Sequence, residues 1–147
     1  MFFIAHRGNL NGPNSKRENK PDYILEALAA GYDVEVDVWY VNDQMYLGHD
    51  GPETPTTMEF LKTKGIWCHA KNISALQKML EHPEIVCFFF DKEEAVLTSN
   101  GYIWTAPGVE ELYPKSISIH PEFNATDITG TSGTVTDYPV RYKEMYG

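Results

Sequence analysis

The stretch Asp-Val-Glu-Val-Asp-Val-Trp-Tyr-Val at residues 33–41 alternates acidic and valine side chains over its first six positions. A period of two is typical of a β-strand, whose successive side chains point to opposite faces of the sheet. Glu35 and Asp37 therefore share one face, and Val34, Val36 and Val38 share the other. Two carboxylates that face one interior repel each other and are costly to desolvate, so a divalent cation such as Mg²⁺ or Ca²⁺ is their natural partner. The same alternation also fits an edge strand that exposes one acidic face to water.

Strand and helix patterns alternate on both sides of this stretch. Short apolar runs predict strands at residues 2–5, 66–70, 85–90, 102–105, 117–119 and 134–136, and residues 44–47 predict a strand that returns from a turn at residues 42–43. Helices are predicted at residues 21–31, 57–64, 74–81 and 92–97 and in the tail to Gly147, with a loop at residues 52–55. This order predicts a single α/β domain over residues 1–147 with mostly parallel strands. Chemically interesting side chains gather at strand ends, where parallel α/β folds bind ligands, at residues 6–7, 37, 69–71, 91, 120–122 and 137.

Charge and composition narrow the partners and the location. Lys and Arg number 12 against 21 Asp and Glu, and the net charge of -9 disfavours nucleic acid or an anionic membrane as the main partner. No stretch reaches the roughly 20 apolar residues of a membrane helix, and no signal peptide is recognised, so the cytoplasm is the expected location. Cys68 and Cys87 form no Cys-x-x-Cys pair and are expected to be buried, reduced thiols.

Two histidines and two cationic residues follow strands near the acidic pair. His6 and His49 each end a strand next to a glycine, and imidazole, with an unperturbed pKa of about 6.5, suits general acid–base catalysis. Arg7 and Lys71 can hold a phosphate, Arg through its bidentate fork and Lys as a point charge. Each side chain taken alone also suits a structural or solvated position, so their combination carries the argument.

The spacing of these residues resembles one known family. Residues 4–8 read Ile-Ala-His-Arg-Gly, residues 17–19 read Arg-Glu-Asn, residues 35–37 read Glu-Val-Asp after a predicted helix, and residues 47–50 read Leu-Gly-His-Asp. This order resembles the glycerophosphodiester phosphodiesterase family, within the phospholipase C-like phosphodiesterases, whose motifs are His-Arg-Gly, Pro-Glu-Asn-Thr, Glu-x-Asp and His-Asp. The resemblance is strong over residues 4–50, weaker over residues 66–72, and returns near residues 133–139.

The resemblance implies a TIM-barrel-like (β/α) barrel with its site at the C-terminal ends of the strands. It assigns acid–base catalysis to His6 and His49, phosphate binding to Arg7 and Lys71, and ligation of Mg²⁺ or Ca²⁺ to Glu35, Asp37 and, at the edge of the site, Glu18.

The third motif strand departs from the family. The family has an acid, any residue and Lys there, with the acid as a metal ligand, whereas residues 69–71 read His-Ala-Lys. His69 would be a softer, uncharged ligand, and as a ligand it favours Mn²⁺, Zn²⁺ or Fe²⁺ over Ca²⁺. Asp91, after the next strand, is a further candidate ligand because it can restore a carboxylate.

The length of the chain shapes the expected fold and activity. A TIM barrel uses ~250 residues, so 147 residues predict a reduced barrel with several outer helices shortened or missing, and with apolar surface that a homodimer can cover. The expected activity is metal-dependent cleavage of a glycerophosphodiester-like small molecule, in which a neighbouring hydroxyl attacks phosphorus and a cyclic phosphate forms. The alternatives are a catalytically inactive phosphodiester-, phosphate- or partner-binding module on the same fold and a purely structural α/β domain.

Overall fold

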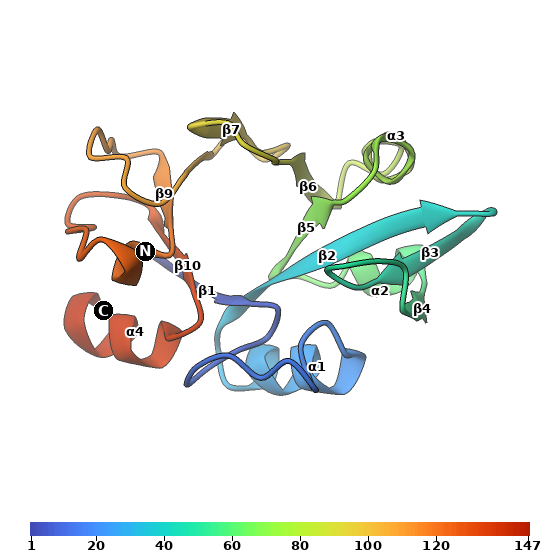
Figure 1. The fold of residues 1–147 in the computed structure, drawn as a ribbon, viewed down its shortest axis with the longest axis horizontal. Coiled ribbons are helices and arrows are strands. Elements are labelled where there is room, and N and C mark those ends of the chain that lie inside the picture. The colour runs from blue at the N-terminus through green and yellow to red at the C-terminus, as the bar shows by residue number, and fades with distance from the viewer.

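One ten-stranded sheet, curled into a half-barrel, forms the framework in the computed structural model, which describes residues 1–147 (Figure 1). The strands are β1 (Phe2–His6), β2 (Asp33–Val41), β3 (Gln44–Leu47), β4 (Thr54–Thr56), β5 (Ile66–Ala70), β6 (Val86–Phe89), β7 (Ala95–Leu97), β8 (Ile103–Thr105), β9 (Ser116–Ile119) and β10 (Gly133–Thr136). The helices are α1 (Pro21–Ala29), α2 (Met58–Leu61), α3 (Ile73–Leu80) and α4 (Pro139–Tyr146), with a 3₁₀ turn at Pro121–Phe123.

Parallel and antiparallel ladders share this sheet. Parallel ladders join the strands in the order β6, β5, β2, β1, β10, β9, β8. Antiparallel ladders add β3 to β2, β4 to β3, and β7 to β8. Strand β2 is long enough to pair with β1 through its first residues and with β3 through its last ones, while β5 runs along its other edge. The parallel strands thus bring the end of β1 beside the acidic residues of β2.

The expected TIM-barrel-like fold is wrong. The sheet is mixed, only 22% of the chain is helical, and no ladder joins β6 to β7, so the sheet does not close into a barrel of alternating β/α units. Only residues 90–94 separate β6 from β7, whereas a crossover to a parallel neighbour needs about a dozen residues or more. The chain therefore turns back after β6, and β7 pairs antiparallel with β8. The prediction of helical turns at residues 92–97 is wrong for the same reason.

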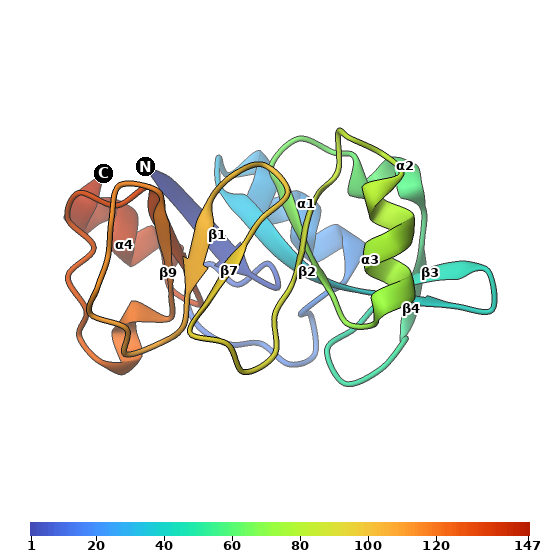
Figure 2. The same ribbon diagram turned by 90° about the horizontal axis from the view of Figure 1, so that it is seen from above.

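The hairpin after β2 also differs in part from expectation. Asn42 and Asp43 both have positive φ, 50° and 61°, as the two central residues of a type I′ hairpin turn do, so the predicted turn is confirmed. Residues 54 and 55, expected to belong to a loop, instead begin β4, because the backbone of residues 54–56 continues the antiparallel ladder on β3. Figure 2 shows the β2–β3 hairpin projecting beyond the rest of the fold.

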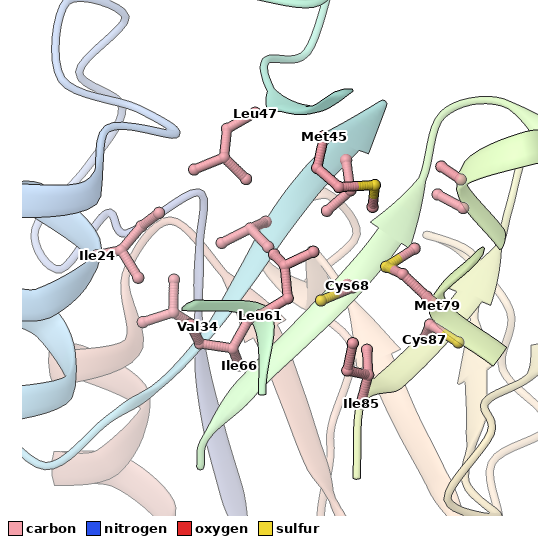
Figure 3. Packing of buried hydrophobic residues seen from close by; sticks show 14 of the residues in the cluster. Ile24, Val34, Met45, Leu47, Leu61, Ile66, Cys68, Met79, Ile85 and Cys87 are labelled. Atoms are coloured by element: carbon pink, nitrogen blue, oxygen red, sulfur yellow. The ribbon is translucent and has the colours of Figure 1, made fainter. Parts of the chain in front are cut away.

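The larger core lies between the sheet and helices α1, α2 and α3 (Figure 3). Val34, Val36 and Val38 of β2 are fully buried in it, which confirms that the valines share one face of the strand. Cys68 and Cys87 lie opposite each other on β5 and β6, and both are buried and free, as predicted. Because the valine face is covered by helices, the acidic face of β2 must point to the concave side of the sheet.

None of the helices is both long enough and apolar enough to cross a lipid bilayer.

Candidate functional site

A cavity of about 240 Å³ lies where the acidic face of β2 meets the ends of the neighbouring strands. One part of its wall is polar and carries His6, Arg7, Glu35, Asp37, His49, His69 and His120. The other part is apolar and carries Phe88, Phe90, Trp104, Pro107, Ile119 and Val135. The cavity therefore combines ionisable groups with an apolar wall, as small-molecule sites usually do.

Glu35, Asp37 and His69 form the most deeply buried cluster of ionisable side chains in the cavity. The register of β2 and β5 places Asp37 directly beside His69, and Glu35 two residues earlier faces the same side. One possible ligand atom from each residue lies within 4.8 Å of the others. The two carboxylates are only 2% and 1% exposed. The geometry therefore fits a cation held by two carboxylates and one imidazole.

The hydrogen bonds around this cluster leave the lone pairs of two acceptor atoms, one on His69 and one on Asp37, facing each other. His69 Nε2–H donates to the carbonyl oxygen of Phe90 at 2.8 Å, because a carbonyl can only accept. In the neutral imidazole, Nδ1 is then an acceptor, and it lies 3.2 Å from Asp37 Oδ1, which is also an acceptor. Glu35 Oε1 is buried and has no hydrogen-bond partner. A cation or an extra proton is needed among these atoms, since buried polar groups are rarely left unpaired.

Burial and neighbouring charges shift the two carboxyl groups in opposite directions. Burial, together with the negative charge of Asp37, raises the pKa of Glu35 well above its usual value. Burial alone would also raise the pKa of Asp37. When His69 Nδ1 carries the extra proton, its hydrogen bond and positive charge, with a hydrogen bond from Asn19, hold that pKa well below its usual value. In the absence of a cation, Glu35 is therefore the carboxyl of the pair that binds a proton more readily.

Arg7 approaches the cluster from the end of β1. Its Nε lies 3.3 Å from Asp37 Oδ2 without a well-directed hydrogen bond, and its Nη1 donates to Glu18 Oε1 at 3.2 Å. The other oxygen of Glu18 accepts from the Asn9 side chain and from the Asn14 backbone N–H. Glu18 is therefore occupied in holding Arg7 in place, and the structure does not bring it to the metal cluster.

His6 and His49 take different positions at the cavity. His6 Nδ1–H donates to Asp137 Oδ1 at 2.8 Å, and Nε2 lies 3.5 Å from Glu35 Oε2. Burial lowers the pKa of His6 by more than the bond to Asp137 raises it, so the ring is neutral at pH 7. The side chain of His49 is 44% exposed, and its Nδ1–H donates to Asp50 at 2.7 Å. His6 is thus an internal group of the cavity and His49 lies at its rim.

Lys71 and Asp91, like Glu18, are residues predicted for the site that lie outside the cavity wall. Lys71 follows β5, and its backbone N–H donates to Val38, but its ammonium group has no ion pair or hydrogen bond. Its positive charge is still close enough to favour the ionised form of Glu35. Asp91 is exposed, and only its backbone N–H is engaged, with Glu93. The structure does not bring Asp91 to the metal cluster.

The sequence placed His120 and Asp137 at strand ends where ligands are expected, but it assigned neither of them a role in the site. His120 follows β9 and lines the cavity, with its ring centroid 4.5 Å from that of His6. Asp137 follows β10, and its carboxylate accepts the hydrogen bond from His6 Nδ1–H. His6, His120 and Asp137 also have ligand atoms within 4.8 Å of one another. The hydrogen bond between His6 and Asp137 satisfies these two groups without an ion, in contrast to Glu35.

The fold and the cavity together define an open, curled-sheet protein with a candidate metal centre beside two histidines. Sequence comparisons gave no matching protein-family model and no matching curated protein.

Proposed function

We propose that the protein is a metal-dependent phosphodiesterase of the glycerophosphodiester phosphodiesterase type, acting on a small glycerophosphodiester-like molecule. The observation that carries this proposal is the buried cluster of Glu35, Asp37 and His69, in which Glu35 Oε1 has no partner. This cluster lies in the same cavity as Arg7 and His6, two residues of the motifs that resemble that family.

Glu35, Asp37 and His69 would hold the divalent cation. Two carboxylates and an imidazole suit Mn²⁺ or another transition metal as well as Mg²⁺, and suit Ca²⁺ less because it takes oxygen ligands. A bound cation supplies charge stabilisation to the phosphoryl oxygens. Because the pKa of Glu35 is raised, cation binding competes with protonation of this carboxyl.

The histidines of the cavity would carry the two proton transfers. His6 is neutral at pH 7, and Asp137 fixes the proton on Nδ1, so Nε2 can accept the proton of a substrate hydroxyl next to the phosphate. That oxygen forms a bond to phosphorus, the bond from phosphorus to the leaving oxygen breaks, and His49 gives a proton to the leaving alcohol. Water then opens the cyclic phosphate with the two histidines in reversed roles.

The remaining groups would bind the substrate. The Arg7 guanidinium, whose Nε faces Asp37 and whose Nη1 donates to Glu18, would bind a phosphoryl oxygen through Nη2, and the ammonium of Lys71 would add positive charge nearby. Phe88, Phe90 and Trp104 offer an apolar surface to the part of the substrate that bears no phosphate.

Turnover of glycerophosphocholine with EDTA, Mg²⁺ or Mn²⁺ tests the proposal. We expect cleavage only with a divalent cation, and a loss of about 10²–10⁴-fold in His6→Gln, because a general base contributes that much. The matched control is His82→Gln, which changes a histidine outside the cavity. Full activity in EDTA, or in His6→Gln, contradicts the proposal. Binding of the diester without cleavage under every cation points instead to an inactive binding module.

A further inference from the structure

We infer that His120 is a phosphate-binding residue of the cavity, and that its Nε2–H donates to a non-bridging oxygen of the substrate's phosphoryl group. This is the group attacked by the hydroxyl that His6 deprotonates. This inference deepens the proposed function and rests on it for the reaction, although the binding of phosphate can be measured separately.

The ring of His120 is held rigidly from three sides. Its Nδ1–H donates to Glu122 Oε1 at 3.0 Å, because a carboxylate can only accept. Phe123 stacks on one face of the ring with centroids 4.6 Å apart, and His6 meets it edge to face. The second oxygen of Glu122 accepts from the Thr136 hydroxyl at 2.9 Å. The carboxylate that orients the ring is therefore itself fixed.

This orientation leaves one nitrogen for a ligand. His120 is only 9% exposed and lines the cavity, yet Nε2 has no hydrogen bond to the protein. Nε2 carries a hydrogen when both ring nitrogens are protonated, and the negative charge of a bound phosphate favours that form. A donor fixed in advance inside a cavity is the arrangement that stabilises negative charge on a phosphoryl oxygen.

The backbone at His120 is unusual for a residue with a side chain. Its φ of 45° and ψ of 56° place it in the left-handed region, which only a few per cent of residues other than glycine adopt, asparagine, aspartate and histidine more often than the rest. Arg7 and Asn19, also at the cavity or its metal cluster, share positive φ values of 55° and 60°. Such conformations gather at ligand sites, where the surrounding structure enforces them.

The distance between the two imidazoles decides which role His120 can take. In an in-line displacement the attacking and leaving oxygens lie on opposite sides of phosphorus. An acid and a base serving them are separated by the whole phosphoryl group and by a hydrogen bond of about 2.6–3.2 Å at each end. Ring centroids only 4.5 Å apart leave too little room for that arrangement. His120 and His6 instead reach two oxygens on the same side of one phosphorus, so His120 binds a non-bridging oxygen.

His120→Asn is the sharpest variant, because asparagine tolerates the left-handed backbone and removes the imidazole. Calorimetric titration with inorganic phosphate in Mg²⁺ measures binding, and kcat is measured with two glycerol phosphodiesters, one releasing choline and one releasing 4-nitrophenol. We expect phosphate affinity to fall about 10- to 100-fold. We expect kcat to fall about 10²–10³-fold, by the same factor for both substrates. Glu122→Gln, which keeps the imidazole, should show smaller losses in the same direction, and His82→Asn should match the wild type.

The outcomes distinguish the inference about His120 from the proposed phosphodiesterase function. Wild-type phosphate affinity and kcat in a folded His120→Asn protein overturn the inference and leave the proposed function standing. A loss of kcat with the choline substrate alone makes His120 the leaving-group acid and also overturns the inference. Phosphate binding that depends on His120, in a wild-type protein that cleaves neither diester, supports the inference and overturns the proposed function. Wild-type protein that neither binds phosphate nor cleaves overturns both.

Discussion

Replacing Glu35 by Gln is expected to change stability in opposite directions without and with a divalent cation. Glu35 is 2% exposed, its Oε1 has no partner, and the carboxylate of Asp37 lies beside it. Without a cation, the folded protein either keeps a proton on Glu35 or bears a buried charge that lacks a partner. The neutral amide introduced by Glu35→Gln has neither cost, so the variant is the more stable protein in EDTA at pH 8.

The size and the pH dependence of this effect follow from the burial. A buried charge without a partner costs several kcal/mol, and protonation relieves part of it, so we expect a gain on the order of 1–3 kcal/mol, about 3–10 °C in Tm for a chain of this length. The pKa of Glu35 is raised in the folded protein, so the folded state holds more protons than the unfolded state above pH 4.5. Wild-type stability therefore falls relative to the variant as pH rises, and the difference vanishes near pH 4.

A divalent cation reverses the order of stability. At about a thousand times its Kd, a cation that binds only the folded protein stabilises the wild type by about 4.1 kcal/mol. Glu35→Gln removes one of the two anionic ligands, so we expect its stabilisation by Mn²⁺ to fall below about 1 kcal/mol.

Urea unfolding in EDTA at pH 4 and pH 8, and in Mn²⁺ at pH 8, measures the difference in stability without a cation, its dependence on pH, and the stabilisation by Mn²⁺. Glu110→Gln is the matched control, since Glu110 is exposed and has no ion pair or side-chain hydrogen bond. A variant less stable than the wild type in EDTA at pH 8 refutes the account of a buried carboxyl without a partner. Equal stabilisation of variant and wild type by Mn²⁺ refutes the placement of the metal at Glu35.

Three further substitutions probe the site and the fold. Asp137→Asn should lower kcat toward glycerophosphocholine about 10- to 100-fold with little change in KM, because Asp137 orients His6; an unchanged kcat contradicts this positioning role. Gly48→Ala should lower the free energy of unfolding in urea by about 1–3 kcal/mol, because the φ of Gly48 is 153° and a Cβ there collides with the backbone carbonyl oxygen of Gly51. An unchanged urea midpoint contradicts that collision. Ile24→Ala should lower the free energy of unfolding in urea by about 2–5 kcal/mol, since Ile24 is fully buried. Leu25→Ala is the control, because Leu25 is half-exposed. Similar losses of stability in the two variants contradict the packing of α1 on the core through Ile24.

Local patterns predicted the strands and the acidic face of β2 well. The alternation of residues 33–38 requires only the two-residue period of a strand, so the valines enter the core and Glu35 and Asp37 face the other way whatever the rest of the fold does. The turn at residues 42–43 was also predictable, because Asn and Asp tolerate positive φ.

The closure of the sheet was not predictable from these patterns. A TIM-barrel-like fold was expected from motif resemblance, but closure depends on whether the connections are long enough to place each strand parallel to the last. Residues 90–94 are too few for such a connection, and β7 joins β8 antiparallel instead.

The sequence by itself determined which residues within β1, β2 or β5 share a face of their own strand, because the two-residue period of a strand is a local property of the chain. Only the tertiary structure decided that His120 and Asp137, more than a hundred residues from His6, lie against it. It also decided that Glu35 Oε1 is left without a partner while Glu18 is fully engaged. These facts depend on how distant strands meet and on which donors reach each oxygen, and no spacing along the chain encodes that.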